Sequence, residues 1–262
     1  MGAGALQLDT NANQNICIGQ NSCQSIVNSF KNIAIGNNTL QVTSSDFNIA
    51  IGESSGIANT TGNGNVFMGI ETGFNNTTGN GNTFVGPQAG YSNITGSENI
   101  YIGPFAGYDA TYGSFNTAIG PFAGEHSNCQ GMIAIGNSAG LVNIGLNNIF
   151  FGNNSGKNNT TGTENIFIGT DAGQNLITGL RNTFIGCESG KNINGYSDNV
   201  LIGSFAGQNS NGHDSICIGS YAGANNQGDD NLYIGNQTGK YSNGRINIAI
   251  GSFAGFENTG NN

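Results

Sequence analysis

The stretch Asn99–Gly107 reads Asn-Ile-Tyr-Ile-Gly-Pro-Phe-Ala-Gly, and related copies of it recur along almost the whole chain. In each copy a glycine directly follows an apolar step, and successive glycines of this kind are always 16 or 17 residues apart. They stand at positions 19, 36, 52, 69, 86, 103, 120, 136, 152, 169, 186, 203, 219, 235 and 251. A fixed period of this kind identifies a repeat architecture. The unit is N-[I/T/V]-[A/F/Y/C]-[I/V]-G-x-x-[A/S/T]-G, and it extends over residues 15–255.

The repeat is too short for a pair of helices, which needs more than about thirty residues in helical arrays. Its apolar step is rich in Ile, Val, Phe and Tyr, the residues that favour strands. One turn of a solenoid with one or two short strands fits this length. The sequence therefore predicts an all-β parallel β-solenoid of about 15 coils of 16–17 residues. We expect a lead-in at residues 1–14 and a single solenoid domain over residues 15–262.

Two positions of the repeat predict what fills the coil. The residue directly before the glycine is always large and apolar, as in Ile18, Ile35 and Met68, and we expect it to point inward. The residue three positions after the glycine is always small, from Ser22 to Ala254, and we expect it to point inward at a corner.

The residue two positions before the glycine should then point outward, because side chains alternate along a strand. It is apolar in every copy, and a continuous outward apolar row marks a contact surface. We therefore predict a homo-oligomer, most simply a trimer. Its predicted interface consists of Phe67, Phe84, Tyr101, Phe150, Phe167, Phe184, Leu201 and Tyr233.

An asparagine opens 13 of the 15 units, and Met132 and Ser215 replace it in the other two. Coils stacked about 4.8 Å apart would bring these amides into hydrogen-bonding range of one another. The sequence therefore predicts an asparagine ladder with a structural role.

Composition narrows the possible partners. The net charge is −9, and the six Lys and Arg residues are scattered, which argues against binding nucleic acid. No stretch approaches the ~20 apolar residues that cross a bilayer, and the first residues do not resemble a signal peptide. The five cysteines show neither a disulfide framework nor a metal-binding spacing, so we expect them to serve packing.

Residues that could carry chemistry are few. His126 and His213 occupy different coil positions, so no catalytic arrangement is indicated, and we predict neither an enzyme nor a cofactor. A weak candidate for cation binding is a column of carboxylates in consecutive coils, for which a solvated acidic stripe is the alternative: Asp198, Asp214 and Asp230. Rings two residues after the glycine could contact glycans or pack between protomers: Phe105, Phe122, Phe205, Tyr221 and Phe253.

The segments Asn32–Gly36 and Asn247–Gly251 both read Asn-Ile-Ala-Ile-Gly. They resemble the head repeats of trimeric autotransporter adhesins, and the unit is similar to the N-T-x-I-G-x-x-A-G repeats of phage and giant-virus fibre-like proteins and of bacterial surface proteins. The resemblance implies a left-handed, trimeric β-roll that serves attachment. A second likeness is to the hexapeptide repeat of left-handed β-helix acyltransferases, whose pattern recurs three times per coil but occurs once per coil here.

These features predict a non-enzymatic structural or adhesive fibre segment, extracellular on a cell or virion surface. It would bind a surface glycan or a host receptor through many weak contacts whose avidity comes from their number. The alternative is a self-assembling extracellular filament subunit that stacks end to end. A carbohydrate-active enzyme is a third possibility. We expect no insertion into a membrane.

Overall fold

The computed structural model describes residue 4 and residues 13–257, and the lead-in predicted at residues 1–14 lies largely outside them. The fold is all-β and a parallel β-solenoid, as the repeat predicted, with about 14 turns where about 15 coils were expected. The chain divides into two compact units, Met1–Gly131 and Met132–Asn262. Among the described residues no helix is long and apolar enough to cross a membrane.

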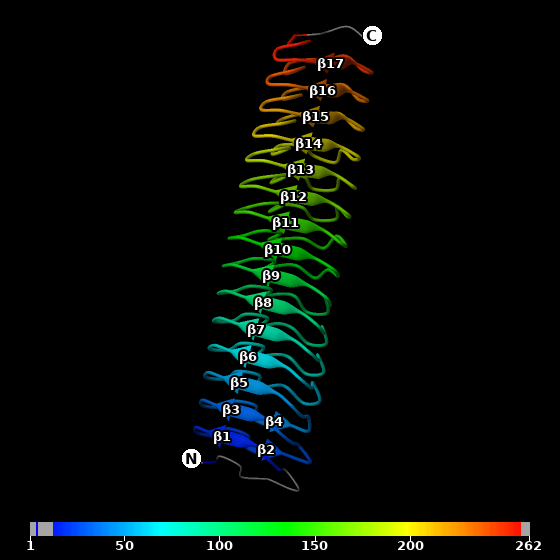
Figure 1. The fold of residues 1–262 in the computed structure, drawn as a ribbon. Coiled ribbons are helices and arrows are strands. Elements are labelled where there is room, and N and C mark those ends of the chain that lie inside the picture. The colour runs from blue at the N-terminus through cyan, green and yellow to red at the C-terminus, as the bar shows by residue number, and fades with distance from the viewer. Residues whose placement is uncertain (1–3, 5–12, 258–262) are drawn as a thin grey trace. The chain divides into compact units, whose positions relative to one another are not determined.

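Each turn contributes one main strand of three residues (Figure 1). The main strands of the first unit are β1 (Ile16–Ile18), β3 (Ile33–Ile35), β5 (Ile49–Ile51), β6 (Val66–Met68), β7 (Thr83–Val85), β8 (Ile100–Ile102) and β9 (Thr117–Ile119). Those of the second unit are β10 (Ile133–Ile135), β11 (Ile149–Phe151), β12 (Ile166–Ile168), β13 (Thr183–Ile185), β14 (Val200–Ile202), β15 (Ile216–Ile218), β16 (Leu232–Ile234) and β17 (Ile248–Ile250). A second, two-stranded sheet in the first unit pairs β2 (Ser25–Ile26) with β4 (Val42–Thr43).

Within each unit every main strand pairs in parallel with the next, and equivalent positions of the repeat are opposite one another. Tyr101 on β8 faces Phe84 on β7, and Phe184 on β13 faces Phe167 on β12. The glycine that follows each main strand, which we call the strand glycine, keeps this stacking close. A Cβ on Gly169 would lie 2.6 Å from the carbonyl carbon of Gly186 in the next coil.

Coils of 16 and 17 residues differ at one corner. In a 17-residue coil the Asn76 side chain donates to the carbonyl oxygen of Gly79, three residues on, at 3.1 Å. In a 16-residue coil Asn143 makes the equivalent bond to Gly145, only two residues on, at 2.9 Å. The missing residue is absorbed in this turn, so the strands keep their register.

The predicted asparagine ladder is confirmed. The Oδ1 atom of Asn48 accepts from both the backbone N–H and the side-chain amide of Asn65, at 2.9 and 3.2 Å. The amide of Asn65 also donates to the carbonyl oxygen of Gly79 at 2.8 Å. Both asparagines are fully buried, so the ladder satisfies interior backbone groups as well as its own amides. Ser215 continues it with its hydroxyl, which accepts from the N–H of Asn231 at 3.3 Å.

The prediction of which strand residues point outward is wrong. The middle residues of the main strands form the core, and those predicted as an oligomer interface are at most 1% exposed: Phe67, Phe84, Tyr101, Phe150, Phe167, Phe184, Leu201 and Tyr233. The residues before the strand glycine, predicted to fill the coil, lie on the surface. Ile18 is 50% exposed and Phe151 is 52% exposed.

The reason for this reversal lies at a second glycine, four residues after the strand glycine. The Phe167 ring lies over Gly173, where an added Cβ would be 2.5 Å from the ring. Tyr233 lies over Gly239 in the same way, at 2.6 Å. The coil therefore has room for a large middle residue because the facing position has no side chain. The small residues predicted to point inward at the corner are buried, as expected for Ser22, Thr39 and their equivalents through Thr238.

Candidate functional site

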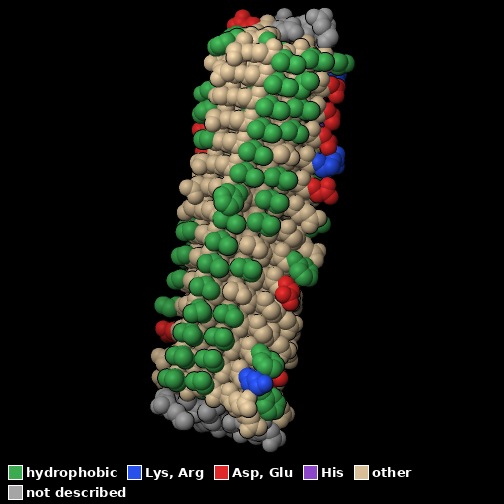
Figure 2. Space-filling model, in the orientation of Figure 1, with side chains coloured by type: hydrophobic (Ala, Val, Ile, Leu, Met, Phe, Trp, Pro, Cys, Tyr) green, Lys and Arg blue, Asp and Glu red, His purple; other side chains and the backbone are tan. Residues whose placement is uncertain are grey.

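A chemically uniform surface of each unit is formed by the first and third residues of the main strands, which we call the outer rows. In the first unit all of them are apolar except Thr83 and Thr117, and in the second all except Thr183. None is charged. Figure 2 shows these hydrophobic side chains as side-by-side pairs over the strands, with charged side chains lying to either side. One side of these rows is exposed to solvent and the other packs on the core, so the rows form a flat apolar face.

Four of the five aromatic residues predicted to contact glycans stack in two pairs, and Phe253 does not stack. The rings of Phe105 and Phe122 are 5.3 Å apart and parallel to within 1°, and those of Phe205 and Tyr221 are 4.6 Å apart. Phe253 is 57% exposed and lies 6.1 Å from the Phe256 ring. Stacking covers one face of each ring in the two stacked pairs. The ring faces open to a sugar are therefore the outer faces of those pairs and the exposed Phe253 ring, and glycan binding stays a prediction.

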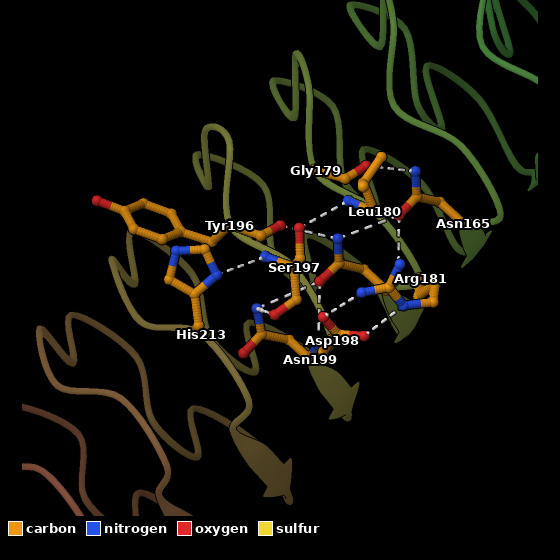
Figure 3. Close-up of polar contacts among 10 residues, drawn as sticks. Asn165, Gly179, Leu180, Arg181, Tyr196, Ser197, Asp198, Asn199 and His213 are labelled. Atoms are coloured by element: carbon orange, nitrogen blue, oxygen red, sulfur yellow. Dashed lines mark hydrogen bonds and ion pairs between the residues drawn. The ribbon is translucent and has the colours of Figure 1, made fainter.

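The three carboxylates proposed as weak cation ligands do not assemble into a site. Arg181 occupies the first of them, donating from Nε and Nη2 to the two carboxylate oxygens of Asp198 at 2.7 Å each (Figure 3). This hydrogen bond and the positive charge of Arg181 lower the pKa of Asp198. Among the described residues no group of three or more His, Cys, Asp or Glu side chains could hold a metal ion, and Asp214 and Asp230 belong to no such group.

The two histidines make local contacts in different coils. His213 accepts a hydrogen bond at Nδ1 from the Ser197 N–H at 3.1 Å, and its ring meets Tyr196 edge-on at 4.9 Å (Figure 3). His126 pairs through Nδ1 with Asp109 at 2.7 Å on the surface. The contacts of the two rings are thus with a backbone N–H and an aromatic ring for His213 and with a carboxylate for His126.

Cysteine usage differs from the prediction at one place. Cys17 and Cys23 form a disulfide, although they were expected to serve packing alone. They occupy the middle-strand position and the second-glycine position of one coil, which face each other in every turn. Cys129 and Cys217 are buried, and burial raises the pKa of Cys217 to about 12. Cys187 is exposed.

An external asparagine ladder in the second unit was missed by the sequence reasoning. Asn158, Asn175, Asn192 and Asn209 each donate a side-chain hydrogen bond to the next asparagine, the last to Asn225, over 2.6–3.0 Å. Three members of this ladder, Asn158, Asn175 and Asn192, line a shallow hollow of about 470 Å³ together with Val142 and Ile177. The signal was the recurrence of asparagine at one further position of five consecutive coils.

No family model, curated protein or solved structure matches the chain.

Proposed function

We propose that the protein is a non-enzymatic fibre segment whose coils associate with other copies of the chain through the outer rows, most simply as a left-handed solenoid in a trimer. The observation that carries this proposal is the uncharged, apolar face of each unit. The predicted oligomer is kept, and its surface moves from the middle residues to the outer rows.

The extent of the face supports an interface of this kind. Seven or eight strands spaced about 4.8 Å apart give a strip about 30 Å long in each unit. With two rows of side chains across it, the strip reaches roughly 300 Å², the scale at which apolar patches on monomers mark contact sites. Its charge-free composition matches the centre of an interface, from which charged residues are depleted.

The attachment role follows from the same architecture. A solenoid repeats each surface position once per coil, so a weak contact with a surface glycan or a receptor is multiplied along the chain. We assign the protein on these grounds to the outside of a cell or virion. The alternative, a filament subunit that stacks end to end, would appear in electron micrographs as long threads, whereas a fibre segment would appear as short rods.

Sedimentation equilibrium tests the self-association. The double variant Ile102→Lys and Ile168→Lys puts one charge on the outer rows of each unit without touching the core. We expect the wild-type chain to sediment at three times its own mass and the variant at the monomer mass, with unchanged circular dichroism. The matched control, Ile102→Thr with Ile168→Thr, uses a residue that the outer rows already contain and should stay oligomeric. A wild-type chain that is monomeric and folded would refute the proposal.

A further inference from the structure

Two neighbouring positions of the coil form columns along one corner of the solenoid. They lie two and five residues after the strand glycine, and we call them the first and second corner columns. The backbone at the first is always left-handed, for example with φ of 59° at Phe105 and 55° at Glu188. The fixed backbone repeats the side-chain direction from coil to coil, so neighbours in a column contact each other.

In the first unit these columns gather five aromatic rings. Phe74, Tyr91 and Tyr108 stack in the second column, with ring centroids 5.0 and 5.1 Å apart. Phe105 and Phe122 stack in the first column, and Phe105 lies 5.8 Å from Tyr108, which joins the two columns.

Carboxylates lie at the two ends of this aromatic cluster. Glu71 precedes Phe105 by two coils in the first column and accepts a hydrogen bond from Gln88 at 2.6 Å. Glu125 follows Tyr108 in the second column, with its carboxylate 3.9 Å from Nε2 of His126. Asp109, next to Tyr108 in the sequence, pairs with Nδ1 of the same histidine at 2.7 Å. The pKa of Tyr108 is raised, mainly by burial and further by the negative potential of Asp109, Glu71 and Glu125. The rings and these acids thus share one electrostatic environment.

The second unit shows what such a corner binds, because lysines of the chain itself occupy it there. Lys191 lies between two carboxylates of the first column, 3.0 Å from Asp171 and 3.3 Å from Glu188. Lys240 lies over the Tyr221 ring, 4.6 Å from its centroid. Both lysines belong to the second corner column. Carboxylates and aromatic faces of this corner are therefore lysine acceptors by their geometry.

The first unit has the acceptors without the lysine. Its single Lys or Arg is Lys31, which lies over the Phe47 ring at 5.2 Å, away from the corner columns. At the position over Phe105 that corresponds to Lys240 over Tyr221, the chain has Glu125. A ring face and flanking carboxylates attract an ammonium group by cation–π and ion-pair interactions.

We propose that this aromatic–acidic corner, formed by Glu71, Phe74, Tyr91, Phe105, Tyr108, Phe122 and Glu125, binds the lysine side chains of a basic segment of another protein. The lysine side chains lie against the rings of the two columns, with one ammonium group at Glu71 and another at Glu125, three coils further along. None of these residues belongs to the outer rows.

Titration with an N-acetylated, C-amidated tetralysine peptide tests the proposal, read out by nuclear magnetic resonance at low salt. We expect saturable shifts at Tyr91 and Tyr108 in the wild-type protein. The variant Glu71→Gln with Glu125→Gln should weaken binding at least tenfold. The matched control, Glu53→Gln with Glu98→Gln, removes the same charge elsewhere in the unit and should change binding less than twofold.

Two further variants test the contribution of the aromatic rings and the location of the binding site. Tyr108→Leu should weaken binding several-fold, and leucine is already present at the equivalent position, Leu141. Glu125→Lys supplies a lysine from the chain itself in the register of Lys240 and should abolish binding while the fold is kept. Absence of tetralysine binding, equal losses in the two Glu→Gln pairs, or displacement of the peptide by a neutral oligosaccharide would each overturn the proposal.

Discussion

The two units have closely similar interiors and different corners. In the first, the rings of Phe67, Phe84 and Tyr101 follow one another at 5.5 and 4.9 Å, and in the second those of Phe150, Phe167 and Phe184 follow at 5.5 and 4.8 Å. The interplanar angles also correspond, 33° and 9° against 36° and 11°. The two interiors agree because every coil offers the same space for its buried side chains.

The corner surfaces differ because the two units differ in their charged residues. The first unit has seven acidic residues and one Lys or Arg, whereas the second has eight and five. The second uses its cations on its own surface, as in the pair of Arg245 with Asp229 at 2.7 Å. A solenoid can therefore keep its core constant while its surface columns change from ones whose charges are paired within the chain to ones with excess acidic residues.

The sharpest test of the shared interior is to remove the central ring of each triplet. Phe84→Ala and Phe167→Ala should each reduce the free energy of unfolding by about 3–5 kcal/mol, because a fully buried ring leaves a cavity. Urea denaturation of both variants measures this. If one substitution cost less than half as much as the other, the two interiors would not be equivalent.

The disulfide distinguishes the first unit from the second. Cys23→Gly converts its coil to the arrangement of Cys217 and Gly223, in which a cysteine faces a glycine. We expect a net loss of about 1 kcal/mol of unfolding free energy, since a short cross-linked loop contributes about 2 kcal/mol and glycine relieves about 1 kcal/mol at a left-handed position. Denaturation with and without a reductant checks this. A wild-type stability that does not respond to reductant would contradict it.

The smallest effect concerns the ion pairs that the second unit keeps for itself. The folded pKa of Asp198 lies below its unfolded value, so its contribution to stability is present above about pH 4 and is lost as the pH falls through the folded pKa. In Arg181→Gln the pKa of Asp198 should return toward its ordinary value. A carboxyl carbon titration by nuclear magnetic resonance measures it, and an unchanged pKa would show that Arg181 does not hold this carboxylate.

The coil, its parallel pairing and the asparagine ladder could be predicted because each depends on a period or a single residue type. The direction of the strand side chains could not be predicted from hydrophobicity, since the inner and outer rows are both apolar. Two signals indicated the right direction. Threonine, which tolerates water, enters the main strands only in the outer rows, at Thr83, Thr117 and Thr183.

The second signal was compensation of volume between positions that face each other. Where the middle residue is small, as in Ala34 and Ala134, a nearby interior position holds a large residue, Leu40 or Met132, and both are fully buried. The sulfur of Met132 lies 3.2 Å from the place of a Cβ on Gly140, within the space that Ala134 leaves open. The stacking of the corner rings was only partly visible, because it required knowing which columns adjoin around the turn.

The hydrogen bonds of the interior asparagine ladder join residues 16 or 17 positions apart, so each of these bonds links a coil to the coil next to it. Duplicating or deleting one whole coil would leave the pairing of every remaining coil intact. Within a unit the stack of strands can therefore lengthen or shorten in steps of about 4.8 Å, and each step brings the same set of surface positions. Mutations that add or remove whole coils can therefore change the length of such a protein over generations without producing a misfolded chain.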